Sequence, residues 1–145
     1  MKLLEILNAS RIIKSGGNTF NLLDNINFSV NEGEFISLMG PSGSGKSTLL
    51  NCIGMLDVFT EGSYTFLGKS VHAMREKHRS KLYKEYIGFV FQAYHLIDEL
   101  TVKENIETPL LYKNVKSSDR KAMVADMLDR FNIFLFYRKK KINWS

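Results

Sequence analysis

The feature that most constrains this 145-residue chain is a glycine-rich loop between an apolar run and a helical pattern. The loop reads Gly40-Pro41-Ser42-Gly43-Ser44-Gly45-Lys46-Ser47-Thr48 and matches G-x-x-x-x-G-K-[ST] at every fixed position. Glycines let backbone N–H groups turn inward, and a helix N-terminus adds positive potential, so such a loop can wrap a polyphosphate. The same residue types also form ordinary turns before helices. The spacing and the flanking elements together favour a nucleotide site.

Three side chains of the loop have distinct expected tasks. Lys46 is expected to reach the terminal phosphates as a point charge. The Ser47 hydroxyl is placed to bind Mg²⁺, because that ion prefers oxygen ligands and bridges the terminal phosphates. Thr48 is expected to donate to the phosphate next inward.

The segments before and just after the loop predict an α/β arrangement. Two early strands are expected, joined by the turn Ser15–Asn18, and Ile26, Phe28 and Val30 alternate as in a half-buried strand. The run Phe35–Met39 is nearly all apolar, which suits a strand covered on both faces in a central parallel sheet. Apolar residues recur at helical spacing from Ser47, with Gly54 close to the helix end.

The second half of the chain predicts one further strand and three helices. The strand centres on Tyr64–Phe66, and a charged, helix-compatible segment runs from Met74 to Tyr86. Thr101 and Glu104 have capping-box spacing, which predicts a helix from there toward Pro109. Ser118 is expected to cap a last helix that reaches Phe131.

Charge and cysteine usage narrow the function classes. Of the 20 Lys and Arg, four stand together at 138–141, leaving 16 against 15 Asp and Glu, so the basic character belongs to the tail. A nucleic-acid surface is therefore not expected, since that needs basic residues spread over one face. The single Cys52 and three scattered histidines fit a reducing compartment without a Cys/His metal set. With neither a secretory leader nor an apolar span in the pattern, we expect a cytoplasmic location.

Beyond the loop, several segments resemble the ATP-binding subunit of an ABC transporter. They are Gly33-Glu34-Phe35, Leu49–Asp57, Gly88-Phe89-Val90-Phe91-Gln92 as the Q-loop, and His95–Val102 with Glu104-Asn105-Ile106. Within that family the chain looks most like the macrolide-exporter, lipoprotein-releasing and cell-division group, over about 132 residues. The resemblance implies a P-loop NTPase fold of ABC type: N-terminal antiparallel strands, a partial parallel core sheet and the start of the helical subdomain.

The resemblance also implies ligands and partners. ATP with Mg²⁺ would bind at Gly40–Thr48, and Gln92 would touch Mg²⁺ or the attacking water, making Lys46 and Gln92 the candidate catalytic residues. Taken alone, Gln92 could equally be a polar residue that ends a buried strand. Ala93–Leu100 would lie near the coupling helix of a transmembrane permease, holding the chain at the inner or plasma membrane, and a second ATP-binding subunit would complete the site. His95 would be structural or part of that interface.

The position of the adenine base is less well specified. In similar proteins adenine stacks on an aromatic residue of the N-terminal strands, and counting back from Leu22 to Ile26 places that position at Ile13. Ile13 cannot stack as an aromatic ring does. Phe20 is near enough to substitute, although a Phe in a strand is also a common core residue.

The chain departs from the family pattern toward its C-terminus. Residues 93–145 contain neither a Leu-Ser-Gly-Gly-Gln signature, nor a strand ending in Asp-Glu, nor a later switch histidine. These groups supply most of the charge neutralisation and water positioning in phosphoryl transfer, so we expect turnover no better than that of a Lys46→Ala variant. We expect a partial ATP-binding domain over 1–132, with the C-terminal core missing, and an apolar and basic tail over 133–145.

Three functions remain open at this point. The chain is expected to be the ATP-binding subunit that couples ATP binding and hydrolysis to export or to lipoprotein or drug efflux. The alternative is a nucleotide-binding module without turnover, or an inactive fragment whose reading frame shifts after Asn132. A different phosphate-loop enzyme such as a small kinase is disfavoured, because the residues after Gly88 match the transporter pattern.

The tail itself has two further interpretations. It could be a genuine divergent end of the chain or a basic segment that binds a membrane surface.

Overall fold

The computed structural model describes residues 1–91 and 95–133. They fall in two compact units, which divide between Phe89 and Val90. The elements in chain order are β1 (Lys2–Ser15), β2 (Asn18–Asn31), α1 (Lys46–Ile53), β3 (Glu61–Phe66), β4 (Lys69–Ser70), α2 (Glu76–Tyr86), α3 (Val102–Tyr112) and α4 (Ser117–Arg130). No helix in these ranges is both long and apolar enough to cross a membrane.

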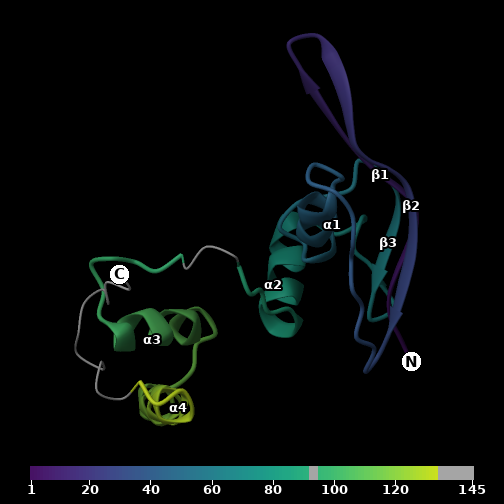
Figure 1. Cartoon of the computed structure of the whole chain (residues 1–145). Helices are drawn as coiled ribbons and strands as arrows, with labels where there is room; N and C mark the ends of the chain where they lie inside the picture. The colour runs from purple at the N-terminus through teal and green to yellow at the C-terminus, as the bar shows by residue number, and fades with distance from the viewer. Residues whose placement is uncertain (92–94, 134–145) are drawn as a thin grey trace. The chain divides into compact units, whose positions relative to one another are not determined.

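The first unit is built on an antiparallel sheet of order β2-β1-β3-β4 (Figure 1). β1 and β2 form a long hairpin whose turn is made by Gly16 and Gly17, with φ of +58° and +80°. Only glycine adopts that backbone readily, which explains the turn that the sequence predicted. β3 pairs with the other edge of β1, from Leu4 opposite Phe66 to Ser10 opposite Glu61. The early strands and the strand around Tyr64 are therefore confirmed.

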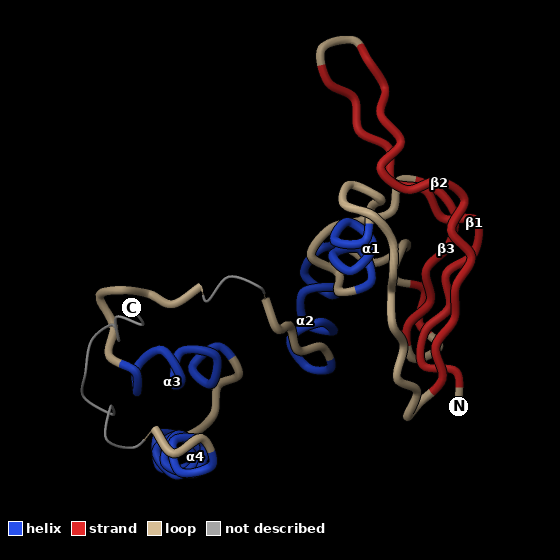
Figure 2. Tube along the Cα trace, in the orientation of Figure 1, coloured by secondary structure: helices blue, strands red, loops and turns tan. Residues whose placement is uncertain are grey.

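The core of this unit lies between the sheet and the two helices α1 and α2, which stand beside the strands in Figure 2. Every second residue of β1 faces inward near its start, since Leu4 and Ile6 are buried. The other core residues include Leu23 of β2, Leu49 and Cys52 of α1, Tyr64 and Phe66 of β3, and Leu82 of α2. The Tyr64 hydroxyl donates to the carbonyl of Ile53 at 2.6 Å and so joins β3 to the end of α1.

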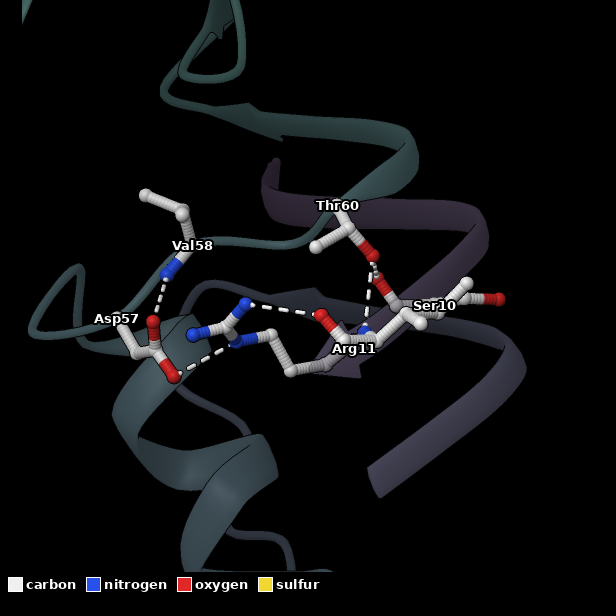
Figure 3. A network of polar contacts seen from close by, with 6 residues as sticks. Ser10, Arg11, Asp57, Val58 and Thr60 are labelled. Atoms are coloured by element: carbon white, nitrogen blue, oxygen red, sulfur yellow. Dashed lines mark hydrogen bonds and ion pairs between the residues drawn. The ribbon is translucent and has the colours of Figure 1, made fainter. Parts of the chain in front are cut away.

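A polar network joins β1 to the segment between α1 and β3 (Figure 3). Arg11 Nε donates to Asp57 Oδ2 at 2.9 Å, and the backbone N–H of Val58 donates to Asp57 Oδ1 at 2.8 Å. The Thr60 hydroxyl donates to the carbonyl of Ser10 at 3.0 Å and accepts from the N–H of Ile12 at 3.0 Å. These contacts hold the segment after α1 against the sheet, and with it the helix itself.

The expected strand Phe35–Met39 is not a strand in the structure, and this part of the prediction was wrong. The segment is extended but forms no ladder, and Phe35 and Met39 keep 94% and 88% of their surface exposed. All strand pairs in the described residues are antiparallel, so the parallel core sheet is not formed there. An apolar run becomes a strand only where a neighbour supplies backbone hydrogen bonds, and none of the described strands pairs with this segment.

The second unit contains α3 and α4. The capping box is confirmed: Glu104 N–H donates to Thr101 Oγ1 at 3.2 Å, and Thr101 N–H donates to Glu104 Oε2 at 2.7 Å. α4 begins one residue before Ser118, which does not cap it; the Ser118 hydroxyl bonds Asp119 instead, and Lys116 holds the N-cap position. That prediction was wrong because Ser118 already lies inside the first turn of α4, where its hydroxyl is not placed to accept from the free N–H groups of the helix start. Arg120 of α4 pairs with Glu107 of α3 at 3.0 Å.

Candidate phosphate-binding site

The glycine loop is held at the start of α1 by two special backbone positions. Gly45 is the N-cap of α1 with φ of +87°, and Gly43 has φ of +79°. A Cβ on Gly45 would lie 2.8 Å from the carbonyl oxygen of Leu22 and 3.0 Å from a methyl group of Leu23. Gly45 is therefore required both for the left-handed backbone and for the close approach of the loop to β2.

The Lys46 ammonium lies inside the curve of the loop. Its Nζ donates to the carbonyl of Gly40 at 2.8 Å, to the carbonyl of Pro41 at 2.5 Å and to Ser44 Oγ at 3.3 Å. The loop thus wraps a positive charge, and phosphate oxygens can replace these neutral acceptors as stronger, charge-assisted partners. This position of the ammonium group is compatible with the predicted contact between Lys46 and the terminal phosphates.

A depression of about 590 Å³ opens beside the loop. That volume is in the range of small-molecule sites, roughly 300–1,000 Å³. It is lined by Ser42, Gly43, Gly45, Lys46, Ser47 and Thr48 of the loop and by Asn21 and Leu22 of β2. The first turn of α1 carries no acidic residue, so the positive end of the helix dipole is not neutralised there. Ser47 is exposed beside this depression, and the binding of Mg²⁺ by its hydroxyl stays a prediction.

The structure brings the loop residues of the predicted site together, but Gln92 lies outside the described residues. Its contact with Mg²⁺ or water stays a prediction. Asn21 and Leu22 were not predicted as site residues, because only the fold places β2 beside the loop. No local sequence signal identifies them.

The segment after Gln92 is described from His95 onward. The His95 ring packs edge-on against Phe91, with ring centres 4.8 Å apart. Asn105 of α3 fixes the backbone of this segment at Ile97. Its side chain accepts from the N–H of Ile97 at 2.8 Å and donates to the carbonyl of Ile97 at 3.1 Å. Leu96 keeps 56% of its surface exposed. The fold thus presents an apolar side chain on a loop that is fixed at its base.

The two residues considered for base contact lie opposite each other. Ile13 of β1 pairs with Phe20 of β2 in the hairpin, and Phe20 is 48% exposed. The next residues along β2, Asn21 and Leu22, line the depression at the loop. An aromatic ring is therefore available one position away from the site, on the strand that borders it.

Comparison with known proteins decides the family. The ABC transporter family model matches residues 23–143, which include the whole phosphate loop. This chain belongs to the ABC transporter family. It is 40% identical over 131 residues to the macrolide export ATP-binding/permease protein MacB of Acinetobacter baylyi, covering 90% of this chain and 20% of that protein. It is 39% identical over 131 residues to the lipoprotein-releasing system ATP-binding protein LolD of Alcanivorax borkumensis, covering 88% of this chain and 58% of LolD.

A solved structure agrees with this family assignment. The dimeric ATP-binding cassette MJ0796, in a post-hydrolysis state bound to ADP and Pi, matches with a TM-score of 0.87 and 35% identity. The match covers 99% of this chain and 63% of that cassette. The ABC-type P-loop fold expected from the sequence is thereby confirmed. The chain spans about a fifth of MacB and less than two thirds of LolD and of the cassette.

Proposed function

We propose that this chain binds ATP with Mg²⁺ as the nucleotide-binding part of an ABC exporter that moves drugs or lipoproteins. The observation that carries the proposal is the Lys46 ammonium enclosed by the carbonyls of Gly40 and Pro41 at the start of α1. That arrangement joins a fixed positive charge, a helix N-terminus and an open depression in one place. MacB and LolD, which the chain is similar to, are named for macrolide export and lipoprotein release.

Each loop group has a role in this proposal. Lys46 binds the terminal phosphates, the backbone N–H groups from Gly43 to Thr48 surround the phosphate chain, and the Ser47 hydroxyl binds Mg²⁺. Thr48 donates to the phosphate next inward. Gln92 is proposed to touch Mg²⁺ or the attacking water, and Mg²⁺ supplies charge neutralisation between the terminal phosphates when it is bound.

The experiment is a titration with a fluorescent ATP analogue in the presence of Mg²⁺. Lys46→Ala should weaken binding at least tenfold, since it removes the charge inside the loop. Lys81→Ala is the matched control, because Lys81 is exposed on α2 and lines no part of the depression. Equal binding by the wild type and Lys46→Ala would overturn the proposal. ATP turnover in the same samples tests the expectation that the chain hydrolyses no faster than Lys46→Ala.

The proposed partners follow from the same family. A transmembrane permease would dock on the segment 93–100, and through it the chain would sit at the inner or plasma membrane. The described part of that segment supports this, because Asn105 fixes it and Leu96 is exposed. A second ATP-binding subunit would complete the site, and the similar cassette MJ0796 is itself dimeric. A photocrosslinker at position 96 should label a membrane protein, whereas one at Leu111 on α3 should not.

A further inference from the structure

The first unit contains a second cavity, about 170 Å³ in volume, that shares no lining residue with the depression at the phosphate loop. Its floor is apolar: Cys52, Phe59, Tyr64 and Val71 are each 1–5% exposed. Arg79 of α2 and His72 stand at its polar side. One wall is the segment held by the network of Figure 3, since Asp57 and Val58 also line the cavity.

The charges around this cavity do not cancel. Asp57 uses both carboxylate oxygens elsewhere, accepting from Arg11 Nε at 2.9 Å and from the N–H of Val58 at 2.8 Å, as Figure 3 shows. The Arg79 side chain is half-buried, and its guanidinium makes no hydrogen bond in the part of the chain that is described; only its backbone N–H does so, to the carbonyl of Arg75. Asp57 is thus paired with Arg11 and feels Arg79 only through its charge, so the positive charge of Arg79 is not neutralised by a hydrogen-bonded partner. A half-buried cation without a hydrogen-bond acceptor favours an anionic ligand.

We propose that this cavity binds a small organic carboxylate with a short apolar or aromatic body. The planar guanidinium of Arg79 matches a carboxylate through two parallel hydrogen bonds, and the body packs on Phe59 and Val71. Drug-sized ligands occupy roughly 300–1,000 Å³, so this cavity takes a body of about one ring. A phosphate dianion fits less well, because it would bring two charges and no apolar part to an apolar floor beside Asp57.

The test uses benzoate and its neutral analogue of the same shape, benzamide. Benzoate should shift the methyl NMR signals of Val58 and Val71, and benzamide should bind at least fivefold more weakly. Arg79→Gln should lower the affinity for benzoate at least fivefold. Arg79→Lys keeps the charge but loses the planar guanidinium, so its affinity should lie between those of the wild type and Arg79→Gln. Arg75→Gln is the control, since Arg75 is exposed and does not line the cavity.

Several outcomes overturn this inference. Equal binding of benzoate and benzamide by the wild type would show that charge plays no part, and this comparison needs no variant to fold. Unchanged benzoate affinity in Arg79→Gln, or shifts confined to Gly43–Thr48, would also overturn it. The inference is independent of the nucleotide site, so Lys46→Ala should bind benzoate as the wild type does. Loss of ATP-analogue binding with retained benzoate binding therefore separates the two proposals.

Discussion

Gly45 has the tightest backbone requirement at the phosphate loop, so it gives the sharpest single-residue prediction. Gly45→Ala should lower the free energy of unfolding by roughly 2–3 kcal/mol, because it combines a strained φ with a 2.8 Å contact to the Leu22 carbonyl. Gly43→Ala is the matched control: its φ is also positive, at +79°, but its Cβ would meet open space. Its cost should be about 1 kcal/mol. Urea unfolding of both variants checks this, and equal losses would contradict it.

Phe20 is the residue that we expect to contact the adenine base. Its ring is exposed on β2 opposite Ile13, next to the residues that line the nucleotide depression. Stacking of an aromatic side chain on a base contributes about 1–3 kcal/mol, so Phe20→Ala should weaken ATP binding at least fivefold. Phe20→Tyr should retain it. Inorganic triphosphate is the control ligand, because it has no base; if Phe20→Ala weakens both ligands equally, the ring does not act through the base.

Between elements, the Arg11–Asp57 pair joins β1 to the segment after α1 and makes stability depend on pH. Burial raises the pKa of Asp57, but the hydrogen bonds from Arg11 and Val58 and the charges of Arg11 and Arg79 together outweigh it, so the pKa lies below its ordinary value. A carboxylate with a lowered pKa stabilises the fold at pH values above its unfolded pKa of about 3.9. That contribution is lost as the pH falls through the lower folded value.

The pH dependence can be measured by urea unfolding between about pH 5 and pH 2.5. The wild type should lose stability as the pH falls below about 4, and Asp57→Asn should be less stable at pH 5 with a shallower loss. Asp24→Asn serves as the comparison, since Asp24 is exposed on β2 and takes no part in the network. A slope for Asp57→Asn as steep as that of the wild type would show that the pair does not set this dependence.

At the scale of the whole molecule, the extended segment Phe35–Met39 leaves large apolar side chains in water. Phe35, Ile36, Leu38 and Met39 are 94%, 43%, 41% and 88% exposed. Exposed apolar chain with unpaired backbone groups promotes association with another chain. We therefore expect this chain to self-associate as its concentration rises, and the double change Phe35→Ser with Met39→Ser to reduce that association.

Sedimentation velocity over a hundredfold range of concentration measures this association. Tyr112→Ser is the control, since Tyr112 is 71% exposed on α3 but stands outside the segment. A chain that stays monomeric throughout, or a double variant that associates as strongly as the wild type, would contradict the prediction.

Local patterns in the sequence were sufficient to predict three features: the phosphate loop, the hairpin turn at Gly16-Gly17 and the capping box of Thr101 and Glu104. These features depend on a few neighbouring residues, because backbone sterics and hydrogen bonds within one turn determine them. The same kind of pattern failed at Ser118, because α4 begins at Ser117 and its N-cap is Lys116. The family could also be identified from the sequence, since the loop and the segments around Gly88 and Glu104 match it over most of the chain.

Other properties of this protein were decided only by tertiary structure. The run Phe35–Met39 has the composition of a buried strand but stays extended and exposed, because a strand requires a partner that its own residues cannot supply. Asn21 and Leu22 become part of the nucleotide site only because the hairpin lies beside Gly45. Cys52 and Arg79 line one cavity although 26 residues separate them in the sequence. Long-range packing places such residues together, and it depends on surfaces that no local pattern describes.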